Sequence, residues 1–418
     1  MLAYSQADIE NTLYIKFPYG IKTSKGSAKS HVLKLKQNLY GQKQAGLVWY
    51  NHLTSRLKRV GFKQSAIDDC VFYKGNVIFF FYVDDGIFVS PDSKEVDKVI
   101  KELKDPAIGL DLEDQGDIAD YLGINFNYGK DVTIIMSQPQ LIDQIIEDVF
   151  KFKRNKNLPD IPALSTCILQ RDEKTHPFKG DFHYRSIIGK LTYLEKGTRP
   201  DIGYATHQLA RFCEDPKASH GKAVEHLVKY LIATRHKGLI LTPIKTKSVE
   251  VYADADFSGN RNKLTAEHDP STTKSRTGYL AMYAGCPIIW KSVLQTQVSL
   301  SITDAEYISL SQSLREVIPV INLLNELKEI NFAPVSIVPA VYCKAFEDNS
   351  GTLELAKTPR LRPRTKHINI VYHHFREHVR KRIIQLFPVS TTDQLADIFT
   401  KPLSVLLCIK FRKEIMGW

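Results

Sequence analysis

The sequence lacks the features that would place it in a membrane or among secreted, disulfide-bonded proteins. Its longest uninterrupted apolar run, residues 77–83, has seven residues, far fewer than the roughly 20 that a transmembrane helix needs. The first residues show no charged segment followed by an apolar stretch, so we expect no secretory signal peptide. The six cysteines are scattered and form no C-x-x-C pair. This argues against a disulfide scaffold or a zinc finger and favours a reducing, intracellular compartment.

Internal repeats and low-complexity tracts are absent as well. Hydrophobic residues make up 43% and charged residues 25% of the 418 residues, close to the average of globular proteins, which excludes wholesale disorder. At roughly 150 residues per domain, this length predicts two or three domains, each long enough to bury a core.

Acidic residues are missing from one long stretch of the chain. This uneven distribution of charge is more informative about possible partners than the net charge of +11. Residues 16–63 contain eleven Lys or Arg and no Asp or Glu, and residues 357–382 contain nine Lys or Arg with Glu377 as the one acid. Basic blocks of this size are expected of a protein with a polyphosphate partner. Two solvated faces of an ordinary protein would give the same counts, so charge alone leaves both interpretations open.

Hydrophobic periodicity predicts alternating short strands and helices over the first 125 residues. A helix over 42–60 has apolar residues at near-helical spacing and Gly61 as its stop. The predicted strands of this part cover residues 12–17, 71–73, 77–83 and 86–90. Residues 137–240 look mainly helical, with a linker near 158–180 and helices at 141–149, 184–196, 201–212 and 220–232.

The pattern changes after a compositional break at 241–248. Strands are predicted at 249–257, 277–283, 287–293, 337–346 and 383–389. Helices are predicted at 303–329, 350–357, 367–380 and 392–400. Three strands followed by alternating helices and strands indicate one compact α/β domain.

Two adjacent carboxylates, Asp84 and Asp85, follow the apolar run 77–83 and precede Gly86. A β-hairpin with an Asp-Gly turn explains this segment without any function. However, desolvating two like charges beside aromatic strands is costly unless a cation compensates. A hairpin turn that presents a carboxylate pair to Mg²⁺ suits metal-assisted nucleotidyl transfer. The residues alone leave both interpretations open.

Four further acids are spread over the C-terminal part of the chain. Asp254 ends a predicted strand, Glu306 opens the long helix, Asp348 follows a strand and Asp397 lies on the last helix. Carboxylates at such positions can converge into a two-metal cluster that activates water for attack on a phosphodiester. Each of them alone is more commonly a surface acid, and Thr303 with Glu306 also fits a capping box.

These acids belong to an ordered set of short motifs. Tyr82-Val83-Asp84-Asp85 has the form Y-x-D-D. Segments 39–45, 121–124, 136–138 and 185–189 are similar to L-Y-G-L-K-Q-A, F-L-G-I, L-S-Q and R-S-L-I-G. Segments 198–201, 303–307, 347–349 and 395–403 are similar to T-R-P-D, T-E-A-E-Y, E-D-N and L-A-D-I-F-T-K-P-L. In this order the motifs resemble the reverse transcriptase and RNase H portion of the copia-type LTR retrotransposon polyprotein, essentially from end to end.

The resemblance implies an α+β multidomain fold. Residues 1–130 would form a partial reverse-transcriptase palm with truncated fingers, and residues 131–245 a helical region like a thumb or connection. Residues 246–405 would form an RNase H-like α/β domain, followed by a C-terminal tail at 406–418.

The resemblance also implies the site residues. The catalytic and metal-binding carboxylates would be Asp84, Asp85, Asp254, Glu306, Asp348 and Asp397. The nucleic-acid-binding residues would be Tyr40, Gly41, Lys43, Gln44, Tyr82, Arg360, Arg362, Arg364, Lys366 and His367. Asp256, a neighbour of Asp254, is expected to support the site rather than to bind metal.

The implied activities are RNA-dependent DNA synthesis by nucleotidyl transfer and endonucleolytic hydrolysis of the RNA strand of RNA–DNA hybrids. Both would use Mg²⁺ or Mn²⁺. The implied biological processes are transposition and DNA integration. The implied partners are an RNA–DNA hybrid, an RNA template, DNA, dNTPs if the polymerase is competent, and a second copy or other products of the polyprotein, without a membrane. The implied location is the cytoplasm, within virus-like particles, or the nucleus.

One departure from the family concerns the first metal carboxylate. In the family this carboxylate is the aspartate of a D-x-x-x-A-[FY] strand, whose last two positions correspond to Ala3 and Tyr4. The aspartate would stand four residues before Ala3, which is before Met1. We therefore expect an N-terminally truncated reverse transcriptase whose DNA synthesis is impaired. The alternative is a decayed or domesticated remnant that binds nucleic acid without catalysis; the intact four-acid set favours an enzyme.

The basic blocks lead to a first testable prediction. The purified chain should bind an RNA–DNA hybrid with an affinity that falls steeply with salt, because the two blocks together hold twenty Lys or Arg. If about six phosphates are neutralised, log K should fall with log[salt] at a slope of about −5. Fluorescence anisotropy over a series of salt concentrations measures this slope, and an affinity independent of salt would contradict the assignment of the blocks to nucleic acid.

Overall fold

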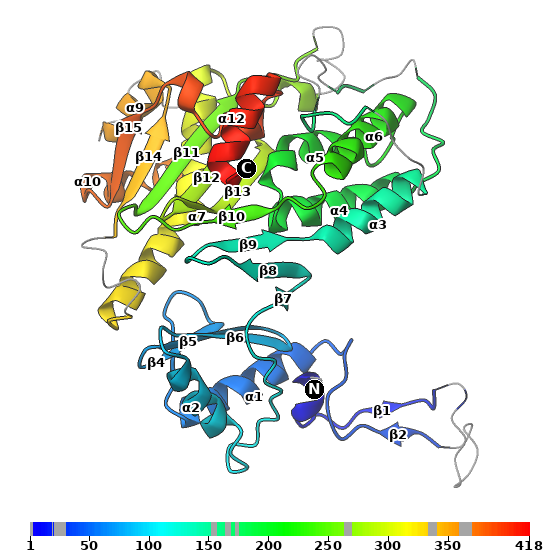
Figure 1. Ribbon diagram of the computed structural model, residues 1–418, viewed down its shortest axis with the longest axis vertical. Coiled ribbons are helices and arrows are strands. Elements are labelled where there is room, and N and C mark those ends of the chain that lie inside the picture. The colour runs from blue at the N-terminus through cyan, green and yellow to red at the C-terminus, as the bar shows by residue number, and fades with distance from the viewer. Residues whose placement is uncertain are drawn as a thin grey trace. The chain divides into compact units, whose positions relative to one another are not determined.

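The computed structural model describes residues 3–18, 20, 31–151, 157–163, 169–171, 175–262, 270–332, 341–358 and 370–418. The chain divides into two compact units (Figure 1): unit 1 comprises Met1–Asp117 and Asn322–Ile337, and unit 2 comprises Ile118–Ile321 and Val338–Trp418. Both units combine helices with strands, so the predicted mixture of α and β structure is confirmed. No helix of the described ranges is both long enough and apolar enough to cross a membrane.

Unit 1 is built on an antiparallel sheet with the strand order β3-β4-β5-β6. Its strands are β3 (Lys63–Gln64), β4 (Val71–Lys74), β5 (Val77–Tyr82) and β6 (Asp85–Val89). The other elements are η1 (Ala3–Gln6), α1 (Ala45–Arg59), α2 (Ser93–Leu103) and the strand pair β1 (Tyr14–Ile15) and β2 (Leu33–Lys34). Trp49, Leu57, Phe79 and Val99 contribute to one buried core. Gly61 follows α1 with a φ of +90°, a conformation that glycine adopts at little cost.

The β5–β6 hairpin turns two residues earlier than the Asp85-Gly86 turn that the sequence suggested. Tyr82 pairs with Asp85, so the turn begins at Val83, whose φ of +54° is unusual for a β-branched residue. Gly86 lies within β6, where a Cβ atom would come within 2.6 Å of the ring of Phe79. The glycine is therefore required by the packing of the Phe79 ring and not by the turn.

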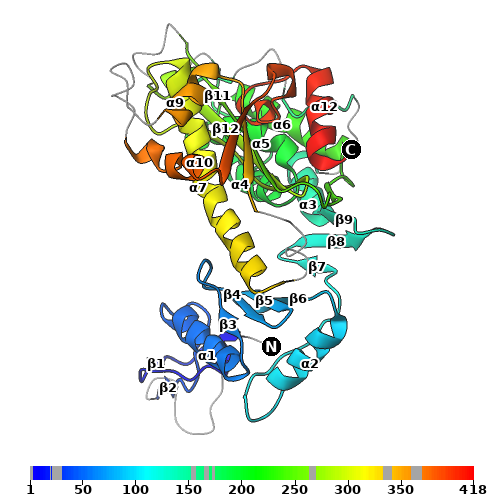
Figure 2. The ribbon, with the colours of Figure 1, turned by 90° about the vertical axis from the view of Figure 1, so that its left-hand side faces the viewer.

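Unit 2 contains a mixed five-stranded sheet with the order β13-β12-β11-β14-β15. Its strands are β11 (Val249–Asp256), β12 (Arg276–Tyr283), β13 (Cys286–Leu294), β14 (Cys343–Glu347) and β15 (Ile384–Pro388). The first three pair antiparallel, whereas β14 runs parallel to β11 and to β15. Helices cover both faces of this sheet (Figure 2). They include α9 (Ser350–Lys357), α10 (Arg376–Arg380), α11 (Asp397–Thr400), α12 (Val405–Met416) and the part of α7 (Ile302–Glu329) up to residue 321.

The helical region of unit 2 corresponds to the helices predicted within 137–240. It comprises α3 (Pro139–Phe150), α4 (Tyr184–Gly197), η2 (Pro200–Ile202), α5 (Gly203–Ala210) and α6 (Ala218–Ala233). Their apolar faces share one core, which includes Ile145, Leu191 and Leu227. The sequence did not predict the accompanying sheet of β7 (Asp120–Tyr121), β8 (Ile124–Tyr128), β9 (Ile134–Ser137) and β10 (Leu239–Leu241). These strands are too short for a clear period-2 pattern, and β9 pairs with β10 about a hundred residues further along the chain.

Two predicted elements of the C-terminal part are broken in the structure. The helix predicted over 392–400 is the short helix η6 (Thr391–Asp393) followed by α11, because Gln394 is extended and its side-chain amide donates a buried 2.8 Å hydrogen bond to the carbonyl of Ala253. Of the helix predicted over 367–380, residues 367–369 lie outside the described residues, and the rest is η5 (Ile370–His373) followed by α10. The strand predicted over 337–346 is observed as β14; residues 333–340 lie outside the described residues.

The prediction of a C-terminal tail at 406–418 was wrong. These residues form most of α12, and Phe411 and Met416 are completely buried in a core shared with Phe399. The indole N–H of Trp418 donates to the carbonyl of Gly238 at 2.7 Å. The guanidinium of Arg412 lies 4.4 Å from the centroid of the Trp418 ring, a cation–π contact. The apolar surface of α12 is therefore buried against residues distant in sequence, which its own pattern did not reveal.

The docking of α12 predicts a large stability effect at one position. Phe411→Ala should lower the free energy of unfolding by about 3–5 kcal/mol, because it leaves a cavity in a fully packed core. Leu406→Ala on the same helix, where the side chain is 84% exposed, should change it by less than about 0.5 kcal/mol. Urea unfolding followed by circular dichroism measures both values, and equal stabilities would show that α12 is not docked in solution.

Candidate active site

The pairing of β11 with β14 determines where two of the predicted acids lie. The two strands run parallel, and Tyr252 is the register partner of Phe346. Asp254 and Asp348 each follow two residues later, so both acids reach the same edge of the sheet. Because strands of a parallel pair end on one side, the carboxylates come together although 94 residues separate them in the sequence.

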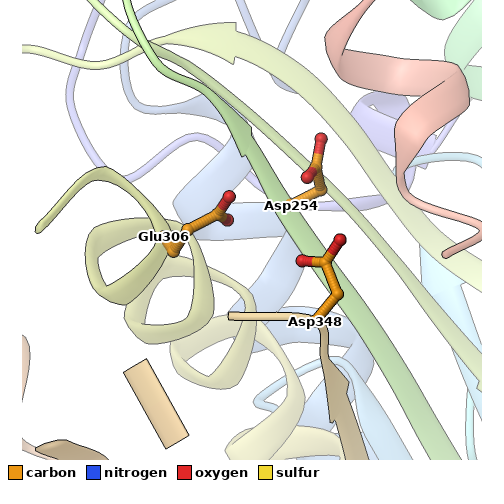
Figure 3. A group of neighbouring side chains, drawn as sticks. All are labelled: Asp254, Glu306 and Asp348. Carbon is orange, nitrogen blue, oxygen red and sulfur yellow. The ribbon is translucent and has the colours of Figure 1, made fainter. Parts of the chain in front are cut away.

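Glu306 reaches the same place from the first turns of α7. The hydroxyl of Ser309 donates to the carbonyl of Asp254 at 2.8 Å and fixes the helix against the strand. One carboxylate oxygen from each of Asp254, Glu306 and Asp348 can be chosen such that all three lie within 4.8 Å of one another. Figure 3 shows the three side chains arriving from β11, from α7 and from the end of β14.

The start of α7 explains why Glu306 is available. In place of the capping box that the sequence suggested for Thr303 and Glu306, the helix is capped two residues earlier, at Ser301. The backbone N–H of Asp304 donates to the hydroxyl of Ser301 at 3.1 Å, and the carboxylate of Asp304 accepts from the N–H of Leu300 at 3.0 Å. These contacts satisfy the helix N-terminus, so the carboxylate of Glu306 is left for another role.

The electrostatics of this group favour a bound cation. Glu306 is 5% exposed, and its Oε2 atom has no hydrogen-bond partner among the described residues. Burial, followed by the charges of Asp254 and Glu347, raises the pKa of Glu306 well above its usual value. Burial and then the charge of Asp254 also raise the pKa of Asp348. A divalent cation would relieve this repulsion, and oxygen ligands of this kind fit Mg²⁺ or Mn²⁺.

Asp397, the fourth predicted acid, lies beside the group without joining it. Within the described part of the chain, the three-acid cluster does not include it. Its Oδ1 atom forms a 2.8 Å ion pair with Lys401, whose Nζ atom is also 3.8 Å from Oδ2 of Asp254. Burial, followed by the charge of Asp254, raises the pKa of Asp397 to about 7. Asp256, predicted to support the site, is likewise outside the cluster, and burial followed by Asp254 raises its pKa to about 6.

Three residues around the cluster were not singled out from the sequence. Glu347 is fully buried, and Lys401 and Thr400 contact Asp254 from α11. Burial raises the pKa of Glu347 well above its usual value. All three lie within the motif segments 347–349 and 395–403. The motifs could have pointed to them, but the residue types alone carried no further signal.

The predicted residues of unit 1 are partly brought together at the β5–β6 turn. Oδ1 of Asp84 accepts a 3.0 Å hydrogen bond from the backbone N–H of Ala3 and a second from the hydroxyl of Tyr40. Burial, followed by the hydrogen bond to Asp84, raises the pKa of Tyr40 to about 12. The indole N–H of Trp49 donates to the carbonyl of Val83 at 2.8 Å and holds the turn on α1.

The other predicted nucleic-acid residues of unit 1 are exposed around this turn or just before α1. They are Gly41, Lys43, Gln44 and Tyr82, and the side-chain oxygen of Gln44 accepts a 3.2 Å hydrogen bond from Asn11. Asp85 is exposed as well, and no third metal-binding side chain of the described residues lies with Asp84 and Asp85. The remaining predicted contacts fall outside the described residues: Arg360, Arg362, Arg364, Lys366 and His367.

Comparison with known proteins bears on the family to which the chain belongs. Residues 1–163 match the family model described as reverse transcriptase (RNA-dependent DNA polymerase). The retrovirus-related Pol polyprotein from transposon RE1 of Arabidopsis thaliana is 30% identical over 417 residues, which are 99% of this chain and 27% of that protein. The corresponding polyprotein from transposon TNT 1-94 of Nicotiana tabacum is 31% identical over 436 residues, covering 99% of this chain and 30% of that one.

Among solved structures, the N-terminal RNase H domain of rv2228c from Mycobacterium tuberculosis, fused to maltose-binding protein, is similar at 12% identity and a TM-score of 0.25. The match covers 37% of this chain and 91% of that one. The match to the family model and the similarity to the two Pol polyproteins show that the chain is a retrotransposon protein of the reverse transcriptase region. It corresponds to the part of the copia-type Pol polyproteins that contains the reverse transcriptase, less than a third of their length, and the resemblance seen in the sequence is confirmed.

The raised pKa values predict how stability depends on pH when no divalent cation is present. The pKa values of Asp256 and Asp397 are about 6 and about 7 in the folded state, above the value of about 3.9 in an unfolded chain. Between these values the folded state therefore binds more protons than the unfolded state. Proton binding stabilises the folded state at low pH, and this contribution to the free energy of unfolding is lost as the pH rises from about 4 to about 7.

Urea unfolding in EDTA at several pH values measures this dependence. Asp397→Asn should flatten the decline, whereas Asp393→Asn, at an exposed position of the neighbouring turn, should leave it unchanged. Adding Mn²⁺ above pH 7 should restore stability to the unmodified chain. A decline of the same steepness in Asp397→Asn as in the unmodified chain would contradict the assignment.

Proposed function

We propose that unit 2 carries a ribonuclease H centre, dependent on a divalent metal ion, that hydrolyses the RNA strand of RNA–DNA hybrids within a retroelement reverse transcriptase region. The observation that supports it most directly is the convergence of Asp254, Glu306 and Asp348 from three separate elements to within 4.8 Å. Buried acids without a cation are costly to hold together, so a cluster of this kind is a candidate for function rather than for stability.

The residues of the chain have separable roles in this proposal. Asp254 and Asp348 would hold the metal from the two strand ends, and Glu306 would add the carboxylate oxygen that has no hydrogen-bond partner in the described ranges. The bound ion would supply a Lewis acid that favours an attacking hydroxide and stabilises charge on the scissile phosphate. Asp397 and Lys401 form an ion pair beside them, where Asp397 can complete the coordination when a second ion binds.

The nucleic-acid partner is proposed from charge and sequence. Arg360, Arg362, Arg364, Lys366 and His367 lie between the third and fourth acids in the sequence. We propose that they contact phosphates of the hybrid next to the scissile bond, since such contacts position a duplex without reading its sequence. An RNA–DNA hybrid, an RNA template and DNA are accordingly the proposed partners.

Residues 1–245 are the basis of a second proposal, a polymerase-related role. We propose that residues 1–130 correspond to palm and fingers and residues 131–245 to a thumb- or connection-like region, with Asp84 and Asp85 as the metal-binding pair for dNTP addition. A two-metal centre usually needs a further carboxylate, and within the described residues no third ligand lies with these two. DNA synthesis by the chain alone is therefore proposed to be weaker than its ribonuclease activity.

The test of the ribonuclease centre is hydrolysis of a hybrid labelled on its RNA strand. Asp254→Asn and Asp348→Asn should each lower the rate at least roughly 10³-fold, about 4 kcal/mol of barrier, because each change removes one charged ligand while preserving size. Hybrid binding, measured by anisotropy, should be retained. Asp393→Asn, with an exposed side chain in the same domain, should behave like the unmodified chain.

The outcomes separate the two candidate functions. Full activity in Asp254→Asn would refute the proposed centre. A chain that binds the hybrid tightly but cleaves it at no pH or metal concentration would favour the alternative, a domesticated protein that binds nucleic acid without catalysis.

A further inference from the structure

The close approach of α11 to the sheet depends on one glycine. Gly278 of β12 is the register partner of Asp254 on β11. A Cβ atom at position 278 would lie 2.4 Å from Cγ2 of Thr400 and 2.9 Å from Cβ of Phe399. Both distances are shorter than van der Waals contact, so α11 can pack directly over Asp254 only because position 278 has no side chain.

Thr400 uses this space to contact the carboxylate. Its side chain is completely buried, and its hydroxyl donates a hydrogen bond to Oδ2 of Asp254. The carbonyl of Asp397, at 3.3 Å, is the other acceptor near the same hydroxyl. A hydroxyl has one proton to donate, and a carboxylate is a stronger acceptor than a carbonyl. The proton therefore belongs to the bond with Asp254.

The hydrogen bond restricts the carboxylate of Asp254. Nζ of Lys401 lies 3.8 Å from the same Oδ2 atom, so two neighbouring residues of the α11 end hold one oxygen. With one oxygen fixed, the carboxylate cannot rotate freely about its Cβ–Cγ bond. Groups that orient a metal ligand in this way typically contribute roughly 10- to 100-fold to metal affinity.

We propose that Thr400 is a positioning residue, which fixes the carboxylate of Asp254 for cation binding through a hydroxyl contact that Gly278 makes possible. This inference rests on the proposed metal-dependent function of the same cluster. Thr400 itself neither binds the ion nor touches the substrate. Its effect is exerted through Asp254.

The experiment measures Mn²⁺ binding to the full chain by isothermal titration calorimetry. The heat that is lost in Asp254→Asn defines the site. Thr400→Val keeps the shape of the side chain without the hydroxyl and should weaken Mn²⁺ binding at this site roughly 10- to 100-fold. Thr400→Ser keeps the hydroxyl and should bind within about threefold of the unmodified chain, since the orienting hydrogen bond is retained.

Thr206 provides the matched control. It is also a completely buried threonine of unit 2, and its hydroxyl has no hydrogen-bond partner among the described residues. Thr206→Val should leave Mn²⁺ binding unchanged. If Thr400→Val does not fold, as judged by circular dichroism, Thr400→Ala replaces it, with the same expected weakening. Gly278→Ala should weaken binding in the same direction by displacing α11.

The outcomes distinguish the inference from the function on which it rests. If the unmodified chain shows no Mn²⁺ binding that depends on Asp254 and no cleavage of a hybrid, the proposed function fails and the inference fails with it. If the unmodified chain binds Mn²⁺, normal affinity in Thr400→Val or Thr400→Ala overturns the inference alone. Equal weakening in Thr400→Ser would also overturn it, because the loss would then come from packing and not from the hydroxyl.

Discussion

The parallel pairing of β11 with β14 is the constraint on which the acidic centre depends. It aligns Tyr252 with Phe346 and so carries Asp254 and Asp348 to one edge of the sheet. The strands themselves are stabilised by apolar residues such as Val251 and Ala345, which are completely buried. The hydrophobic core thereby supplies the free energy that holds like charges at a separation they would not adopt in an open chain.

The cost of this arrangement appears in the protonation behaviour of the cluster. The pKa values of Glu306, Asp348 and Asp397 are all raised, first by burial and then by neighbouring carboxylates. Lys401 offsets part of this charge from α11, and the charges of Asp254 and Asp397 raise its own pKa although burial opposes that shift. These shifts are the physical reason for proposing that Asp254, Glu306 and Asp348 bind a divalent cation.

The two carboxylate sites of the chain are built in different ways. Asp84 lies on an exposed two-residue turn, and the neighbouring donors Ala3 and Tyr40 bond to it directly. Asp254 is 3% exposed, and a helix from the far end of the chain covers it. The turn is held by residues 81 and 44 positions away in the sequence, whereas the buried cluster depends on the pairing of β11 with β14 and on the packing of α7 against β11.

The sequence by itself determined the long helix that became α7 and the order of most strands and helices after residue 249, because these depend on spacing within single elements. The four acids were singled out by the resemblance of their motifs to a family. The sequence did not determine the turn at Val83, the docking of α12 or the contact of Thr400 with Asp254, since each depends on a partner brought close by packing. The last pair is separated by 146 residues. Only the tertiary structure shows that Asp254, Glu306 and Asp348 form one cluster while the fourth acid, Asp397, forms an ion pair with Lys401. The reason is that a local sequence pattern does not specify distances between side chains on different elements.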